Sequence, residues 1–128
     1  MPAAGDTFLI QDAHGTEHLH IVVSDPRVDP HHIVLVPVTT WEDYKDDTCI
    51  LDADDIKGIP FLGHESCVDF QEALLTSEQR LAAAVASKKA RHHKPVPMAL
   101  VEKIRSRACE SRRIPNKCLM TLEAQNLV

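Results

Sequence analysis

The chain has 128 residues, of which 44% are hydrophobic and only 4% aromatic, so we expect one domain with a mainly aliphatic core. No apolar run approaches the length of a membrane span and no signal peptide opens the chain, which predicts a cytoplasmic protein. The four cysteines are widely spaced and form no CxxC pair, so they are expected to be buried thiols in a reducing compartment.

The net charge of −5 conceals a strong asymmetry along the chain. Residues 1–79 carry 16 acids and three bases, whereas residues 80–118 carry 11 bases and two acids. Such a division indicates two functional halves. Two interpretations of the basic half stay open: solvated helix faces partly neutralised by the acidic half, or a surface for nucleic acid or an acidic partner.

The first half has the pattern of short β-strands. Branched or alternating apolar residues predict strands over 6–10, 18–24, 33–38 and 49–51. Turn sequences separate the first three, with Gly15 in one turn and two Asp-Pro pairs in the next. Residues 66–75 fit a strand or a helix, and a strand is favoured at their start.

The second half has the pattern of helices. The sequence TSEQ predicts a capping box in which Thr76 caps a helix and Gln79 reaches back. A second helix is expected over 98–111, and Pro115 is expected in the first turn of a third. The chain therefore predicts a single α+β domain over 1–128: a small sheet or barrel over 1–75, followed by a basic helical extension over 76–128.

Histidines are the first candidates for chemistry, because no motif of high specificity occurs and no cofactor is implied. His18 and His20 form HLH on a strand, so both project from the same face. They could be ordinary polar residues, or could hold zinc if His64, Cys49 or Asp47 lay near them. Proton transfer is the other use, for which His20 and His64 are the candidates.

The corner after the third predicted strand supplies further candidates. Thr39 and Thr40 stand where a buried strand meets solvent, and their hydroxyl groups could bind phosphate or simply end the strand. Trp41 could fill the core or stack on an unpaired base, and Tyr44 is expected to be more exposed. The acids that follow could hold a cation, but a solvated loop is expected, and its charge would repel a phosphate backbone.

The order of these segments resembles the PemK/MazF-like toxins. The resemblance covers roughly residues 5–80 and rests on the opening Gly5-Asp6, on HIVVSDP, on VLVPVTT and on SCVDFQEALLTSE. It implies a small SH3-like barrel, a toxin–antitoxin pair and a homodimer. It also places Thr39 beside the RNA-cleaving site, whereas the arginine that many active members carry at the start of the second strand is absent from HGTEHLH.

Three functions follow as hypotheses, one of which is a small metal-binding protein that uses HLH. The resemblance implies a metal-independent endoribonuclease that cleaves single-stranded RNA, with His20, His64, Thr39 and Thr40 as catalytic candidates and an antitoxin as partner. The alternative is a non-enzymatic SH3-like module that binds protein or nucleic acid through its basic helices. The candidates for contact with RNA are Trp41, Tyr44, Arg105, Arg107, Arg112 and Arg113.

Overall fold

A computed structural model of the chain describes residues 2–57, 59 and 65–128. These residues form seven short strands and four helices, with one 3-10 turn between the fifth and sixth strands. In chain order they are β1 (Thr7–Gln11), β2 (Glu17–Val22), β3 (Ile33–Thr40), β4 (Ile50–Leu51), α1 (Ala53–Ile56), β5 (Ser66–Val68), η1 (Phe70–Glu72), β6 (Leu74–Thr76), α2 (Glu78–Ala86), β7 (Ala90–His93), α3 (Met98–Ala108) and α4 (Asn116–Ala124).

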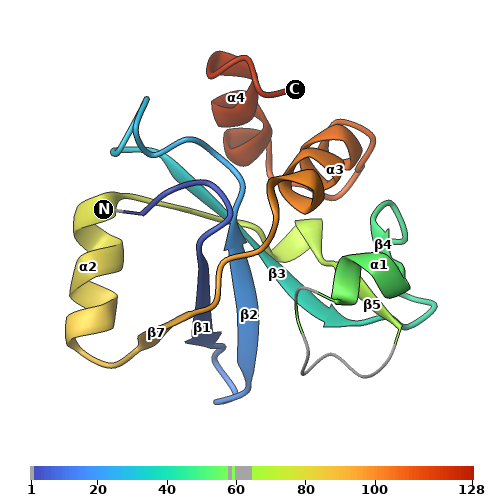
Figure 1. The fold of residues 1–128 in the computed structure, drawn as a ribbon, viewed down its shortest axis with the longest axis horizontal. Coiled ribbons are helices and arrows are strands. Elements are labelled where there is room, and N and C mark those ends of the chain that lie inside the picture. The colour runs from blue at the N-terminus through green and yellow to red at the C-terminus, as the bar shows by residue number, and fades with distance from the viewer. Residues whose placement is uncertain (1, 58, 60–64) are drawn as a thin grey trace.

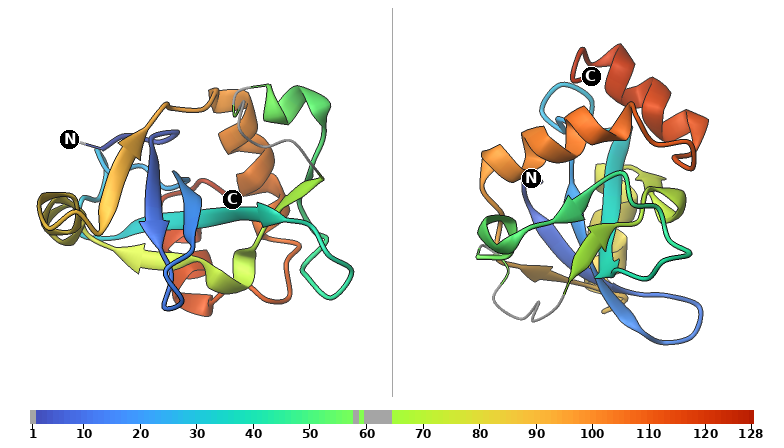
Figure 2. Two further views of the ribbon diagram at one scale, coloured as in Figure 1. Left: turned by 90° about the horizontal axis from the view of Figure 1, so that it is seen from below. Right: turned by 90° about the vertical axis from the view of Figure 1, so that its right-hand side faces the viewer.

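The strands form one antiparallel sheet in the order β4-β5-β3-β2-β1-β7, and β6 also pairs with β3. β1 and β2 make a hairpin that projects beyond the neighbouring strands (Figure 2). Its turn is built on Asp12, whose carboxylate accepts the backbone N–H groups of His14 and Thr16 at 2.8 and 3.0 Å. Gly15 adopts the left-handed backbone conformation, with φ of +81°, that closes this turn.

Side chains of alternate residues divide the sheet into two faces. Leu19 and Ile21 of β2 and Val36 of β3 point to the main core, together with Val101 and Ile104 of α3. Cys118 and Leu122 of α4 are fully buried in the same cluster, so the amphipathic stripes of both helices cover this face. Figure 1 shows α3 (orange) and α4 (red) on this side of the sheet and α2 (yellow) on the other.

The second face of the sheet is covered along only part of its length. At one end a small apolar cluster joins the strands to Leu81 of α2; its strand residues are Phe8, Val22, Ile33 and Leu35. Farther along the same strands this face carries His18, His20 and Thr39 together with apolar residues such as Pro37. The face therefore changes from a packed core to an open surface of polar and apolar side chains where the cover of α2 ends.

Pro37 marks the point at which β3 changes its pairing partner. β6 pairs with β3 over Ile33–Leu35 and β5 pairs with it over Val38–Thr40, so η1 spans the interval between them. The carbonyl oxygen of Pro37 accepts the N–H of Asp69 at 2.9 Å. Because proline has no N–H to donate toward that side, the partner strand can leave the ladder there without orphaning a donor.

The α+β architecture confirms the predicted fold class, while two local predictions need correction. Thr76 is the last residue of β6 rather than a helix cap, and Ser77 caps α2 by accepting the N–H of Arg80. The basic extension is not wholly helical, because β7 lies within it and pairs with β1. Within the described ranges, every helix is too short or too polar to cross a bilayer.

Candidate functional site

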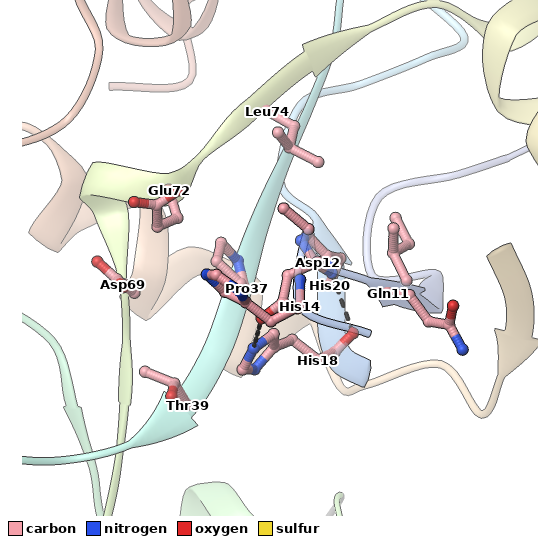
Figure 3. A pocket seen from close by; sticks show the side chains of 12 residues that line it. Gln11, Asp12, His14, His18, His20, Pro37, Thr39, Asp69, Glu72 and Leu74 are labelled. Carbon is pink, nitrogen blue, oxygen red and sulfur yellow. Dashed lines mark hydrogen bonds and ion pairs between the residues drawn. The ribbon is translucent and has the colours of Figure 1, made fainter. Parts of the chain in front are cut away.

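The open end of the second sheet face forms a cavity of about 450 Å³. The β1–β2 hairpin, β2, β3 and the segment around η1 build it, and Figure 3 shows their side chains converging on one space. The polar groups that line it are Gln11, Asp12, His14, His18, His20, Thr39, Asp69 and Glu72. Two of the predicted catalytic residues, His20 and Thr39, are thus brought together although 19 positions separate them in the sequence.

His20 is the most buried polar group of this cavity, with only 7% of the residue exposed. It lies opposite Pro37 in the β2–β3 ladder, and its Nδ1 lies 3.0 Å from the carbonyl oxygen of His18. Because a carbonyl oxygen only accepts, Nδ1 carries the hydrogen and Nε2 is left with its lone pair. Burial lowers the pKa of His20 to about 4, so the ring is neutral at physiological pH.

His18 projects from the same strand face and is held by the hairpin turn. Its Nε2 lies 3.1 Å from Oδ2 of Asp12. The other carboxylate oxygen of Asp12, Oδ1, accepts the two backbone N–H groups of the turn, so one oxygen binds the turn and the other binds His18. The hydrogen bond from Thr16, followed by those from His14 and His18, lowers the pKa of Asp12. A carboxylate fixed in this way sets the orientation of the His18 ring.

Lys45 supplies a cation beside Thr39. Its Nζ donates to Oγ1 of Thr39 at 3.0 Å and to the carbonyl oxygen of Thr40 at 2.8 Å. The side chain of Thr40 is exposed and lies outside the residues that line the cavity. A hydroxyl group and an ammonium group therefore stand together at the end of β3, where a phosphate could meet both.

The loop that carries Lys45 is fastened to the C-terminal part of the chain. Asp46 is 5% exposed and accepts hydrogen bonds from the hydroxyl groups of Ser111 and Thr48. Burial raises the pKa of Asp46, but these bonds outweigh it, so the pKa lies below its usual value. Arg113 donates from Nη1 to the carbonyl oxygen of Tyr44 at 2.9 Å. The C-terminal segment thus sets the position of the loop on both sides of Lys45.

The two aromatic residues of this corner differ in exposure. Trp41 is half-buried, and its Nε1 is enclosed without a hydrogen-bond partner among the residues that the structure describes. Tyr44 is 67% exposed, as expected from the sequence, and Nζ of Lys45 lies 5.8 Å from its ring centroid. Neither residue lines the cavity, so stacking of a base on them stays a prediction about the neighbouring surface.

The four arginines that were candidates for RNA binding do not form one surface of free charges. Arg105 is half-buried and donates from Nε to the carbonyl oxygen of Val23 at 2.7 Å, and burial lowers its pKa. Arg113 holds the Tyr44 carbonyl, and Arg107 lies 4.0 Å from Glu110. Arg112 is exposed. Two of the four therefore have structural roles that charge counting cannot reveal.

Other predicted ligands are separated or fall outside the description. His64 lies outside the described residues. In the described part of the chain, no group of three or more His, Cys, Asp or Glu could hold a metal ion. Cys49 is buried away from the cavity, and burial raises the pKa of its thiol to about 11.

Four residues at or beside the site were not predicted from the sequence: Lys45, Asp12, Asp69 and Glu72. Only Asp12 could have been found from the sequence, because it lies in the turn beside HLH.

Comparison with known proteins agrees with the family resemblance at the level of the fold. No family model matches the sequence, and no curated protein matches it. Among solved structures, MazF (Form-I) from Deinococcus radiodurans superposes with a TM-score of 0.52 at 17% identity, over 85% of this chain and 94% of that one. This chain has a MazF-like fold. The MazE–MazF (Form-II) structure from the same organism gives 0.51 at 16% identity, over 89% of this MazF-like chain and 97% of that one.

Proposed function

We propose that this chain is a cytoplasmic, metal-independent endoribonuclease of the toxin–antitoxin type that cleaves single-stranded RNA. The observation that carries the proposal is that His20 and Thr39 line one cavity at the open end of the sheet, where Lys45 donates a hydrogen bond to Thr39. A histidine can move the proton of the 2′-hydroxyl, and a hydroxyl–ammonium pair can bind the phosphate and the charge it develops. Lys45 would then supply the positive charge that the absent arginine leaves missing.

The rest of the cavity indicates how the RNA would enter. Asp12, Asp69 and Glu72 line it, and their negative charge disfavours a long duplex backbone near the opening. A single flexible strand can direct one phosphate toward Lys45 and keep its neighbours away from these carboxylates. A cavity of about 450 Å³ has the size of sites that accept one small ligand, here one nucleotide.

The fold also supports a partner protein as part of the proposal. One of the similar structures is a complex of MazE with MazF, so we propose that an antitoxin binds this chain and that the chain pairs with itself. The four cysteines are free thiols, and three of them are buried as expected, whereas Cys109 is exposed. Free thiols are compatible with action in the reducing cytoplasm.

The experiment is cleavage of a single-stranded RNA by the purified chain in the presence of a chelator. Thr39→Val removes the hydroxyl group at nearly constant shape, whereas Thr39→Ser keeps it. Lys45→Met removes the charge and Lys45→Arg keeps it. We expect cleavage by the parent chain, losses of about 100-fold in the first variant of each pair, and partial recovery in the second. A parent chain that leaves RNA intact contradicts the proposal.

A further inference from the structure

Two histidines of unequal surroundings face the same cavity, and the proposed cleavage needs two proton transfers. His18 and His20 are two residues apart on β2, so their Cα atoms lie about 7 Å apart on one face of the strand. Both side chains line the same cavity, so one phosphate group bound there can lie within reach of each ring. Figure 3 shows His18, His20 and Thr39 among the side chains that line this cavity.

The surroundings of the two rings differ in the way that an acid and a base require. His20 is enclosed, its Nδ1 hydrogen is committed to the His18 carbonyl, and its Nε2 keeps a lone pair. His18 is more exposed, with 29% of its side chain accessible, and its Nε2 is bound to Asp12. A carboxylate that accepts a hydrogen bond from one ring nitrogen fixes the orientation of the ring and compensates the charge of its protonated form. The other nitrogen, Nδ1, can then donate a proton.

From this arrangement we propose that His20 is the general base and that His18, oriented by Asp12, is the general acid of the cleavage. The inference rests on the proposed function and assigns the two halves of its chemistry. The 2′-hydroxyl gives its proton to Nε2 of His20 while its oxygen forms a bond to phosphorus. The bond from phosphorus to the 5′-oxygen breaks, and Nδ1 of protonated His18 gives its proton to that oxygen. The products are a 2′,3′-cyclic phosphate and a 5′-hydroxyl end.

Several charged groups surround this pair. Asp12 and His14 of the hairpin and Asp69 and Glu72 of the segment around η1 line the cavity, and Lys45, which is not a lining residue, is hydrogen-bonded to Thr39. Because burial lowers the pKa of His20 to about 4, the base stays unprotonated well below neutral pH. We expect kcat/KM to hold down to about pH 5, because the base is still unprotonated there.

A substrate with a 5′-bridging sulfur separates the two roles, because a thiolate leaves without being protonated. The chain and its variants are compared on an RNA with one oxygen linkage and on the same RNA with a phosphorothiolate at that linkage. His18→Gln should lose about 100-fold on the oxygen substrate and return to within about threefold of the parent on the sulfur substrate. Asp12→Asn should lose about tenfold on the oxygen substrate and recover in the same way.

The controls make each outcome decisive. His18 is partly exposed, so its variant is expected to fold, and a thermal unfolding curve checks this. His31→Gln changes an exposed histidine outside the cavity and should match the parent on both substrates. Equal losses of His18→Gln on the two substrates overturn the assignment while the ribonuclease proposal stands. A parent chain that cleaves neither substrate overturns both.

Discussion

The two ends of one sheet face differ in what covers them. At the end beneath α2, Phe8, Leu35 and Leu81 pack into a closed apolar cluster. At the other end, the same strands present His18, His20 and Thr39 to a cavity. Both ends are built on alternating side chains of β2 and β3, so the difference arises from which residues occupy the alternate positions. A short helix that covers only part of a sheet thereby leaves a rigid platform for polar groups.

The largest expected effect concerns the open end. His20→Gln should lower kcat/KM for RNA cleavage by about 100-fold or more, because the variant lacks the group that we propose as acceptor of the 2′-hydroxyl proton. Initial rates on a single-stranded RNA, with His31→Gln as the matched variant, measure this effect. If both variants cleave alike, the open end is not the site.

The covered end should respond in stability instead of rate. Leu81→Ala removes a side chain that is 5% exposed, and should lower the free energy of unfolding by about 3 kcal/mol. Urea denaturation measures the loss, and cleavage by the folded variant should stay at the parent rate. A stable Leu81→Ala chain with impaired cleavage would show that the two ends of the face do not act separately.

The burial of His20 should also lower the stability of the protein at acidic pH. Its pKa falls from 6.5 to about 4 on folding, so the unfolded chain binds a proton between these values that the native chain does not. Stability should therefore decrease as pH falls through this window, by about 3 kcal/mol at most from this one group. His20→Gln should lose less stability than the parent between pH 7 and pH 4.5 in urea titrations. Parallel losses would mean that His20 is not buried as described.

The smallest effect concerns the loop that brings Lys45 to the open end. Ser111→Ala removes the hydroxyl group that donates to Asp46, leaving a buried carboxylate with fewer donors. We expect a loss of about 1–2 kcal/mol in unfolding free energy and a few-fold loss in cleavage. Ser106→Ala, on the exposed side of α3, is the matched change and should leave both quantities unchanged. Equal behaviour of the two variants would separate the C-terminal segment from the site.

Much of the sheet could be predicted because its signals are local. β1, β2 and β3 consist of branched or alternating apolar residues between turn sequences. That His18 and His20 lie on the same face of β2 follows from strand geometry alone. β7 could not be predicted in this way, since ARHH contains no β-branched residue and follows a helix-forming stretch. Its conformation comes from pairing with β1, a contact distant in sequence.

The site was predictable only where it lies on regular strands. Thr39 and His20 were candidates because strand ends and strand faces can be located from the sequence. Lys45 was not, because its position depends on a loop held by Asp46 and Ser111, which are 65 residues apart. Arg105 is the opposite case, because it was predicted to bind RNA and instead donates to the carbonyl oxygen of Val23. The sequence shows the charge of Arg105 but does not show this contact.

Pro37 gives the cavity a wall without taking part in any reaction. An ordinary residue at this position would present an N–H toward η1, and that donor would favour a continuous ladder between β3 and its neighbour. Asp69 and Glu72 lie where the ladder is interrupted, and both line the cavity. The missing backbone N–H of Pro37 therefore contributes to the shape of the cavity.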